Sequence, residues 1–81
     1  MRLDKYLKVS RLIKRRTIAN QVCDAGKVLV NGKIARASYD VKLSDVIEFS
    51  FGGHTTKLEV LSLVPAVRKE EAESMYRIMS Q

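Results

Sequence analysis

The sequence is poor in the residues that build disulfides, metal sites and catalytic centres. Its 81 residues include one cysteine, Cys23, and one histidine, His54. A single cysteine cannot form an internal disulfide, which fits a reducing compartment, and one cysteine with one histidine cannot complete a structural zinc site. His54 follows two glycines and has no obvious acid or nucleophile partner. We therefore expect a protein that is not an enzyme and that uses no metal or other cofactor.

Long apolar runs are missing as well. No segment approaches the ~20 apolar residues that cross a bilayer, and residues 1–5 do not begin a signal peptide. No phosphate-binding loop of the GxxxxGK type is present either. These absences predict a cytoplasmic protein. A chain of 81 residues has room for one domain and is near the lower end of what folds alone.

Positive charge is what the chain does have, and it is unevenly distributed. Residues 1–42 hold eleven of the fifteen lysines and arginines with three acids, a net charge of +8. Residues 43–81 hold four basic and six acidic residues, a net charge of −2. Such a basic cluster is typical of a nucleic-acid-binding surface, and a plain solvated surface is the alternative. An anionic membrane would also attract it, but no basic amphipathic helix with a wide apolar face is present to insert.

Apolar spacing predicts two helices in the basic half. The first is expected over about residues 2–9. The second is expected over about residues 17–25, with Thr17 near its N-cap and Gly26 just beyond its end. Cys23 lies on the apolar side of the second helix, so we expect it in the core.

The pattern then alternates as in strands, and glycines mark the turns. Asn31-Gly32 predicts a tight hairpin, and a second hairpin tip is expected at Gly52-Gly53-His54. Pro65 ends the sheet, and residues 68–79 predict a C-terminal helix. The expected fold class is α+β: two N-terminal helices packed on a small, mostly antiparallel sheet, with a C-terminal helix.

The N-terminal pattern resembles a known RNA-binding module. The segments that carry the resemblance are Arg2-Leu3-Asp4-Lys5-Tyr6-Leu7, Arg15-Arg16-Thr17 and Gly26-Lys27-Val28-x-Val30-Asn31-Gly32. Together they are similar to the αL-motif domain first seen in ribosomal protein S-four, over about residues 2–51. The short length and the tail at residues 69–76 resemble the stand-alone bacterial RqcP group, which is related to a small heat-shock protein of the same domain family.

The resemblance implies one RNA-binding domain over residues 1–81, with a strand and C-terminal helix extension over about 55–81. It also implies binding to ribosomal RNA and tRNA on a large ribosomal subunit that still carries peptidyl-tRNA. An RqcH-type factor would be the partner there, recruiting alanyl-tRNA for alanine tailing of the stalled chain. In this ribosome-associated quality control the protein would act as a monomeric clamp and not as a catalyst.

Two groups of basic residues are the candidate RNA contacts. Arginine binds phosphate through a planar fork of N–H groups, and the start of the second helix adds free backbone N–H groups. The first group is Arg2, Arg11, Lys14, Arg15 and Arg16. The second group is Lys5, Lys8, Lys27, Lys33, Arg36 and Lys42, for which steering charge or simple solubility is the stronger interpretation.

Asp4 is a candidate site residue of another kind, because it is an acid inside the basic cluster. Two interpretations are open: its carboxylate positions arginine or lysine side chains, or it stabilises the helix start through the helix dipole. The function has alternatives too, as an RNA-targeting accessory module for an RNA-modifying enzyme or as an interaction protein that uses its acidic half. Only Tyr6 and Tyr39 offer aromatic stacking in the basic half, which favours recognition of RNA backbone and shape.

Overall fold

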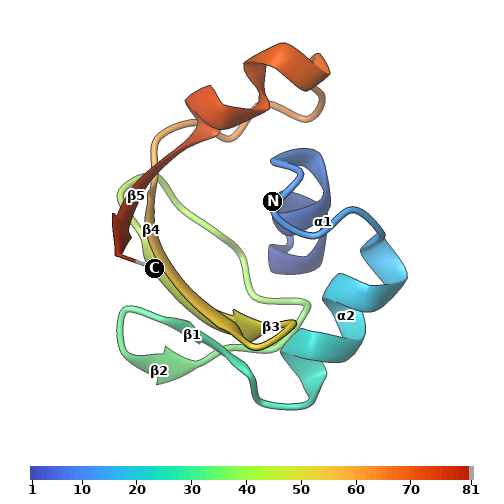
Figure 1. The fold of residues 1–81 in the computed structure, drawn as a ribbon, viewed down its shortest axis with the longest axis vertical. Helices are drawn as coiled ribbons and strands as arrows, with labels where there is room; N and C mark the ends of the chain where they lie inside the picture. Colours follow the sequence, from blue (N-terminus) through green and yellow to red (C-terminus); the bar gives the residue numbers. More distant parts are fainter. Residues whose placement is uncertain (81) are drawn as a thin grey trace.

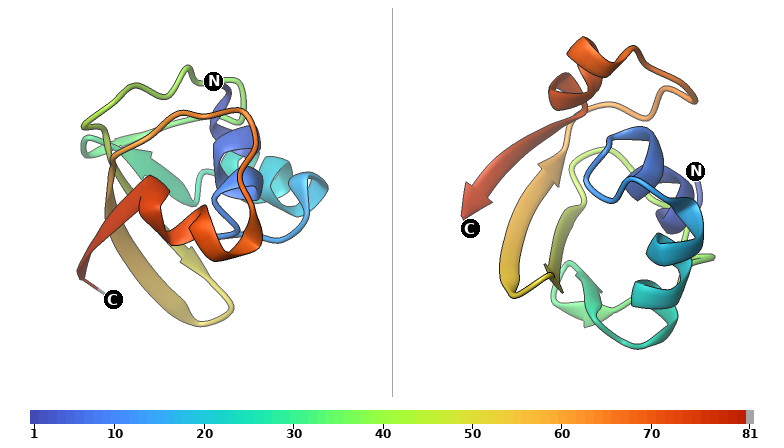
Figure 2. Two further views of the ribbon diagram at one scale, coloured as in Figure 1. Left: turned by 90° about the horizontal axis from the view of Figure 1, so that it is seen from above. Right: turned by 45° about the vertical axis from the view of Figure 1, so that its right-hand side comes forward.

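A curved five-stranded sheet wraps around two helices in the computed structural model, which describes residues 1–80 and only the backbone of Phe51 (Figure 1). All neighbouring strands are antiparallel, in the spatial order β2-β1-β3-β4-β5. The helices lie together on the concave side of the sheet, as a second set of views confirms (Figure 2). The strands are β1 (Val28–Val30), β2 (Lys33–Ile34), β3 (Val46–Phe51), β4 (His54–Val60) and β5 (Tyr76–Ser80). The expected α+β class is therefore confirmed.

The two N-terminal helices are α1 (Leu3–Val9) and α2 (Arg16–Asp24). Both bury their apolar sides against the sheet, and Cys23 is fully buried as expected. The N-cap of α2 is Arg15, which has no side-chain cap. Thr17 lies two residues beyond it, so the expectation that Thr17 caps this helix is wrong. Gly26 has φ +78°, which suits a glycine just past a helix end. No helix among residues 1–80 is long and apolar enough to cross a membrane.

Both expected hairpins are present. Asn31 and Gly32 have φ values of +52° and +84°, the combination that a two-residue hairpin turn requires. This turn joins β1 to β2, with Val30 paired to Lys33. The second turn, at Gly52-Gly53, joins β3 to β4.

The C-terminal helix is shorter than the sequence pattern predicts. Only Lys69–Met75 is helical, as the 3-10 helix η1, and Tyr76–Ser80 forms β5. The spacing of apolar residues in this tail favoured a helix. The tail instead forms a strand because the edge of β4 offers unpaired backbone groups, which gain hydrogen-bond partners when β5 pairs with them. The prediction that the sheet ends at Pro65 is therefore wrong, and so is the prediction of a helix over residues 76–79.

A hydrogen bond from Tyr6 ties the first helix to this C-terminal segment. Its phenol donates to the carbonyl of Met75 over 2.8 Å, and both side chains are fully buried. The same carbonyl accepts the backbone N–H groups of Leu61 and Ser62 at 2.8 and 3.2 Å. Tyr6 is thus a core residue, and the expectation that it offers a stacking surface to RNA is wrong.

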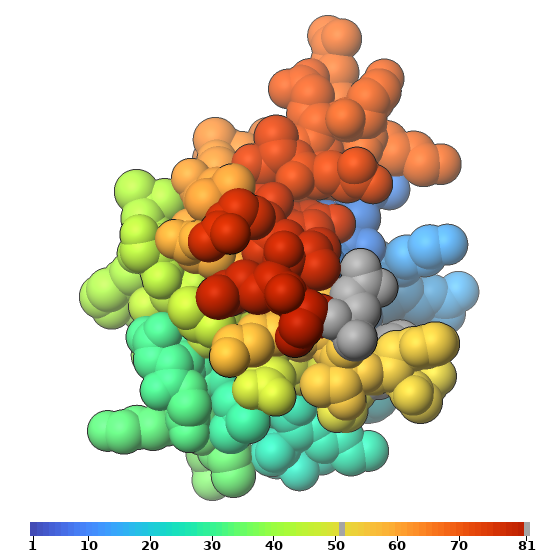
Figure 3. All heavy atoms as spheres, turned by 60° about the vertical axis from the view of Figure 1, so that its left-hand side comes forward, coloured from blue at the N-terminus to red at the C-terminus, as the bar shows by residue number. Residues whose placement is uncertain are grey.

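The outer face of the sheet differs in charge from the basic N-terminal half. Figure 3 views this face, which is filled mainly by segments from β1 to β5 and η1, with the blue N-terminal helices largely behind. Glu48 lies opposite Lys57, and Glu59 lies opposite Arg77, with which it forms an ion pair. Charges of both signs therefore alternate on the outer face.

Candidate nucleic-acid interface

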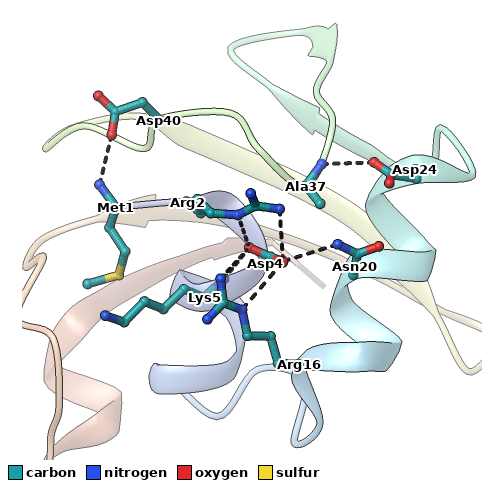
Figure 4. Close-up of polar contacts among 9 residues, drawn as sticks. All are labelled: Met1, Arg2, Asp4, Lys5, Arg16, Asn20, Asp24, Ala37 and Asp40. Carbon is teal, nitrogen blue, oxygen red and sulfur yellow. Dashed lines mark hydrogen bonds and ion pairs between the residues drawn. The ribbon is translucent and has the colours of Figure 1, made fainter.

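A buried carboxylate joins the two helices within the basic surface. Only 3% of the Asp4 side chain is exposed. Arg2 approaches it with Nε 3.1 Å from Oδ1, and Arg16 approaches with Nε 3.4 Å from Oδ2 (Figure 4). The side-chain amide of Asn20 donates to Oδ2 over 3.2 Å, and the backbone N–H of Lys5 donates to Oδ1 over 2.8 Å. Asp4 is therefore the acceptor that holds side chains from α2 beside the start of α1.

The charge of this cluster remains positive. Burial alone would raise the pKa of Asp4, but hydrogen bonds from Arg2, Asn20 and Arg16 outweigh it and hold the pKa below its ordinary value. One ionised carboxylate thus faces two guanidinium groups. The side chains of Arg2 and Arg16 are 50% and 48% exposed, so each has N–H groups left for a ligand. An arrangement that fixes arginine forks while leaving them accessible is suited to phosphate.

Both interpretations of Asp4 from the sequence fit this geometry. The residue lies in the first turn of α1, where a negative charge is stabilised by the helix dipole. Its carboxylate also accepts hydrogen bonds from the two arginines, which is the positioning role. The buried position of Asp4 was not predicted, because its place in the helix pattern put it away from the apolar side.

Three more candidate cations lie in the connection between α1 and α2. Arg11, Lys14 and Arg15 are all exposed there. Among the residues that the structure describes, none of the three forms an ion pair with a carboxylate. Lys8 is exposed in the last turn of α1, whereas Lys5 is half-buried and reaches Asp4 only through its backbone N–H. These residues extend the basic surface from the Asp4 cluster along the helix connection.

The remaining candidates belong to other parts of the surface. Lys27 lies in the turn between α2 and β1, and Lys33 lies in β2. Arg36 is exposed in the segment after β2, and the Lys42 ammonium lies 5.7 Å from the centre of the Tyr39 ring. These four cations all lie after α2 in the chain, and among the described residues none of them pairs with Asp4.

Three polar residues with structural hydrogen bonds were not predicted from the sequence: Asn20, Asp24 and Asp45. Asn20 was missed although it lies four residues after Arg16, a spacing that places both on one side of α2. Asp24 accepts the backbone N–H of Ala37 over 3.1 Å. Asp45 is buried and accepts hydrogen bonds from Asn31, Tyr39 and the backbone of Lys42, and no local pattern marks it.

Asp45 fixes the loop before β3. Burial alone would raise its pKa, but the hydrogen bonds that it accepts outweigh burial and hold the pKa below its ordinary value. Asn31 contributes twice, because its Nδ2 donates to Asp45 over 3.0 Å and its Oδ1 accepts the backbone N–H of Val46 over 2.9 Å. The carboxylate therefore links the β1–β2 turn to the loop that leads into β3.

Two features bear on other kinds of chemistry. Within residues 1–80, no group of three or more His, Cys, Asp and Glu residues is arranged to hold a metal ion. Burial raises the pKa of the Cys23 thiol to about 12, so the thiol is protonated at neutral pH.

Comparison with known proteins agrees with the resemblance drawn from the sequence. The S4 domain model matches residues 1–47. The "RQC P-site tRNA stabilizing factor" of Streptococcus pneumoniae is 49% identical over 81 residues, which are 100% of this chain and 92% of that protein. The protein of the same name from Bacillus subtilis is 49% identical, over 100% of this chain and 94% of that protein.

The fold has a close counterpart among solved structures. Heat Shock Protein 15 of Vibrio cholerae has a TM-score of 0.92 and 30% sequence identity, over 99% of this chain and 82% of that chain. The family model, the full-length relatives and this structure all point to the same group of proteins. This chain belongs to the S4 domain family, in the branch that contains the RQC P-site tRNA stabilizing factors.

Proposed function

We propose that this protein binds RNA on the large ribosomal subunit and stabilises a P-site tRNA there during ribosome-associated quality control. Full-length similarity to relatives named for stabilising a P-site tRNA supports the assignment. The structural observation that carries the proposal is the pair of ion pairs that buried Asp4 forms with Arg2 and Arg16. Two half-exposed guanidinium groups, one from the N-cap of α1 and one from the first residue of α2, share this acceptor and form a receptor for RNA phosphates.

The binding mode is electrostatic docking combined with recognition of shape. A-form RNA displays its phosphates and 2′-hydroxyl groups in a regular geometry, which proteins recognise without reading bases. The Asp4 cluster supplies fixed contacts, and the exposed Arg11, Lys14 and Arg15 supply further charge. The candidate contacts are Arg2, Asp4, Lys5, Lys8, Arg11, Lys14, Arg15, Arg16, Lys27 and Lys33, with Asp4 acting by positioning.

The whole chain works as one RNA-binding domain in this proposal. The αL motif over about residues 2–51 makes the contacts, and residues 55–81 extend it. The extension supports the motif, because the Tyr6 phenol bonds to the Met75 carbonyl and Met75 lies in the core. The protein acts in the cytoplasm as a non-catalytic clamp.

The partners are ribosomal RNA of the large subunit, tRNA and an RqcH-type factor that drives alanine tailing of the stalled chain. We propose that the protein acts as a monomer. The solved structure of the Vibrio cholerae relative is trimeric, and the sedimentation coefficient of the purified chain would distinguish a monomer from a trimer.

Sedimentation of the tagged protein from cells with stalled translation tests this function. We expect it in the fractions of large subunits that carry peptidyl-tRNA, with less on intact ribosomes, and crosslinked to both ribosomal RNA and tRNA. Deleting the RqcH-type factor should abolish alanine tails, and deleting this protein should reduce them. Recovery only with small subunits, or with a free RNA-modifying enzyme, would contradict the assignment.

A further inference from the structure

We propose that the connection between α1 and α2 holds a pocket for one unpaired nucleobase of the bound RNA. The proposal rests on the proposed RNA-binding function and adds to it a site for a base. The pocket has a volume of about 350 Å³, at the lower end of the range of roughly 300–1,000 Å³ for small-molecule sites. Its lining residues are Arg11, Leu12, Ile13, Lys14, Arg15 and Ile18.

The interior of the pocket is aliphatic. Ile13 is 2% exposed and belongs to the core, and Leu12 and Ile18 pack against the core while remaining partly exposed. Apolar side chains of this kind receive the face of an unstacked base in proteins that take a nucleotide out of its helix. The interior of the pocket therefore fits a flat ligand with apolar faces.

The rim of the pocket is cationic. Arg11, Lys14 and Arg15 surround the aliphatic interior, and among the described residues none of them is neutralised by a carboxylate. A neutral apolar ligand would leave these three charges without a partner. A nucleotide satisfies both parts, because its base is flat and largely apolar on its faces while its phosphates carry negative charge.

Backbone hydrogen bonds hold the pocket in shape before any ligand binds. The N–H of Ile13 donates to the carbonyl of Leu7 over 3.1 Å, and the N–H of Arg11 donates to the carbonyl of Lys8 over 3.1 Å. Arg11 has φ +63°, which turns the chain sharply after α1. Since the connection is already ordered by the C-terminal carbonyls of α1, a base would bind with little ordering cost.

The pocket also adjoins the phosphate-binding cluster. Arg15 lines the pocket, and the next residue, Arg16, contacts Asp4. Arg16 also lines a second hollow, together with Asp4, Thr17, Asn20 and Gln21. An RNA helix held by the Asp4 cluster would thus present a bulged or splayed nucleotide to the pocket.

Binding of the full chain to two RNA hairpins tests the proposal. Both hairpins have the same length, charge and single-nucleotide bulge, but one carries adenine in the bulge and the other an abasic sugar. We expect the wild-type protein to bind the adenine hairpin about tenfold more tightly, as for a base that gains an apolar contact. Leu12→Ser should remove this difference without changing affinity for the abasic hairpin, and Leu43→Ser, at an exposed leucine elsewhere, should retain it.

The outcomes separate the pocket from the function on which it rests. Equal affinity of the wild-type protein for the two hairpins would overturn the proposed base pocket and leave the RNA interface intact. This comparison uses only the wild-type protein, so it does not depend on whether a variant folds. Binding to neither hairpin would overturn both. A preference that survives in Leu12→Ser, with an unchanged thermal midpoint, would place the base elsewhere. Binding of an acidic, leucine-containing peptide that Leu12→Ser abolishes, without any adenine preference, would assign the pocket to a protein partner and also overturn the proposal.

Discussion

Arg16, the first residue of α2, contacts Asp4 in the first turn of α1, with Nε 3.4 Å from Oδ2. One carboxylate thereby holds the starts of both helices together and orients two arginines toward solvent. Asp4 is almost fully buried, whereas Arg16 is half exposed. A change at Asp4 should therefore affect folding and binding together, and a change at Arg16 should affect mainly binding.

Asp4→Asn should lower the free energy of unfolding by about 1.5–3 kcal/mol, the range for hydrogen bonds to a charged group. It should also weaken RNA binding although it makes the chain more positive by one charge, because Arg2 and Arg16 lose the ionised carboxylate that they share and one of its two acceptor oxygens. Urea denaturation and an RNA titration measure the two effects. Asp40→Asn is the matched control, since that carboxylate is 71% exposed and pairs only with the N-terminus and Lys42 among the described groups. Tighter RNA binding by Asp4→Asn would contradict the positioning role.

Acid should destabilise the fold through two buried carboxylates. The pKa values of Asp4 and Asp45 are lower in the folded chain than in a free aspartate. Their stabilisation is therefore fully present above the pKa of the unfolded chain and is lost as the pH falls through the folded values. We expect the free energy of unfolding to be nearly constant from about pH 7 to 5 and to fall below about pH 4. The free energy of unfolding of Asp45→Asn should fall less steeply with acid than that of the wild type. An identical pH profile would show that Asp45 does not contribute to the acid dependence.

Cys23 should be inert in the folded protein. Its side chain is fully buried and its thiol has a pKa of about 12, so thiol reagents at pH 8 should react only as fast as the chain unfolds. Cys23→Ala should cost about 1 kcal/mol or slightly more of stability through lost packing, without a change in RNA specificity. Rapid labelling of the native protein, or lost RNA binding at unchanged stability, would refute a purely structural role.

RNA binding should depend strongly on salt. About five phosphate contacts give an expected slope of log K against log salt of roughly −3.5 to −4.5, through release of counterions. Arg2→Ala removes one phosphate contact and should therefore reduce the magnitude of this slope by about 1. A flat response would show that the basic half is not the binding surface.

Much of this fold was predictable because it depends on short-range sequence patterns, and the part that was not depends on contacts between distant segments. The Asn31-Gly32 turn and the glycine after α2 depend on local backbone preferences, which a sequence displays directly. Strand β5 depends on the free edge of β4, a partner at least sixteen residues away, and the local spacing in the tail favoured a helix. The site divides in the same way: charge clustering indicated Arg2 and Arg16, but only the packing of α1 on α2 reveals that Asp4 is buried between them.

The affinity of Arg16→Ala for large ribosomal subunits that carry peptidyl-tRNA tests the central claim most directly. Asp4 keeps Arg2 and Asn20 as partners in this variant, so the thermal midpoint should change little. We predict a loss of about 1.5–3 kcal/mol of binding free energy, as for a charge-assisted hydrogen bond. Arg77→Ala, which removes an exposed arginine that also pairs with a carboxylate but lies in β5, should bind like the wild type. Equal losses in the two variants, or a loss in Arg16→Ala that follows unfolding, would contradict the assignment of the Asp4 cluster as the RNA-binding surface.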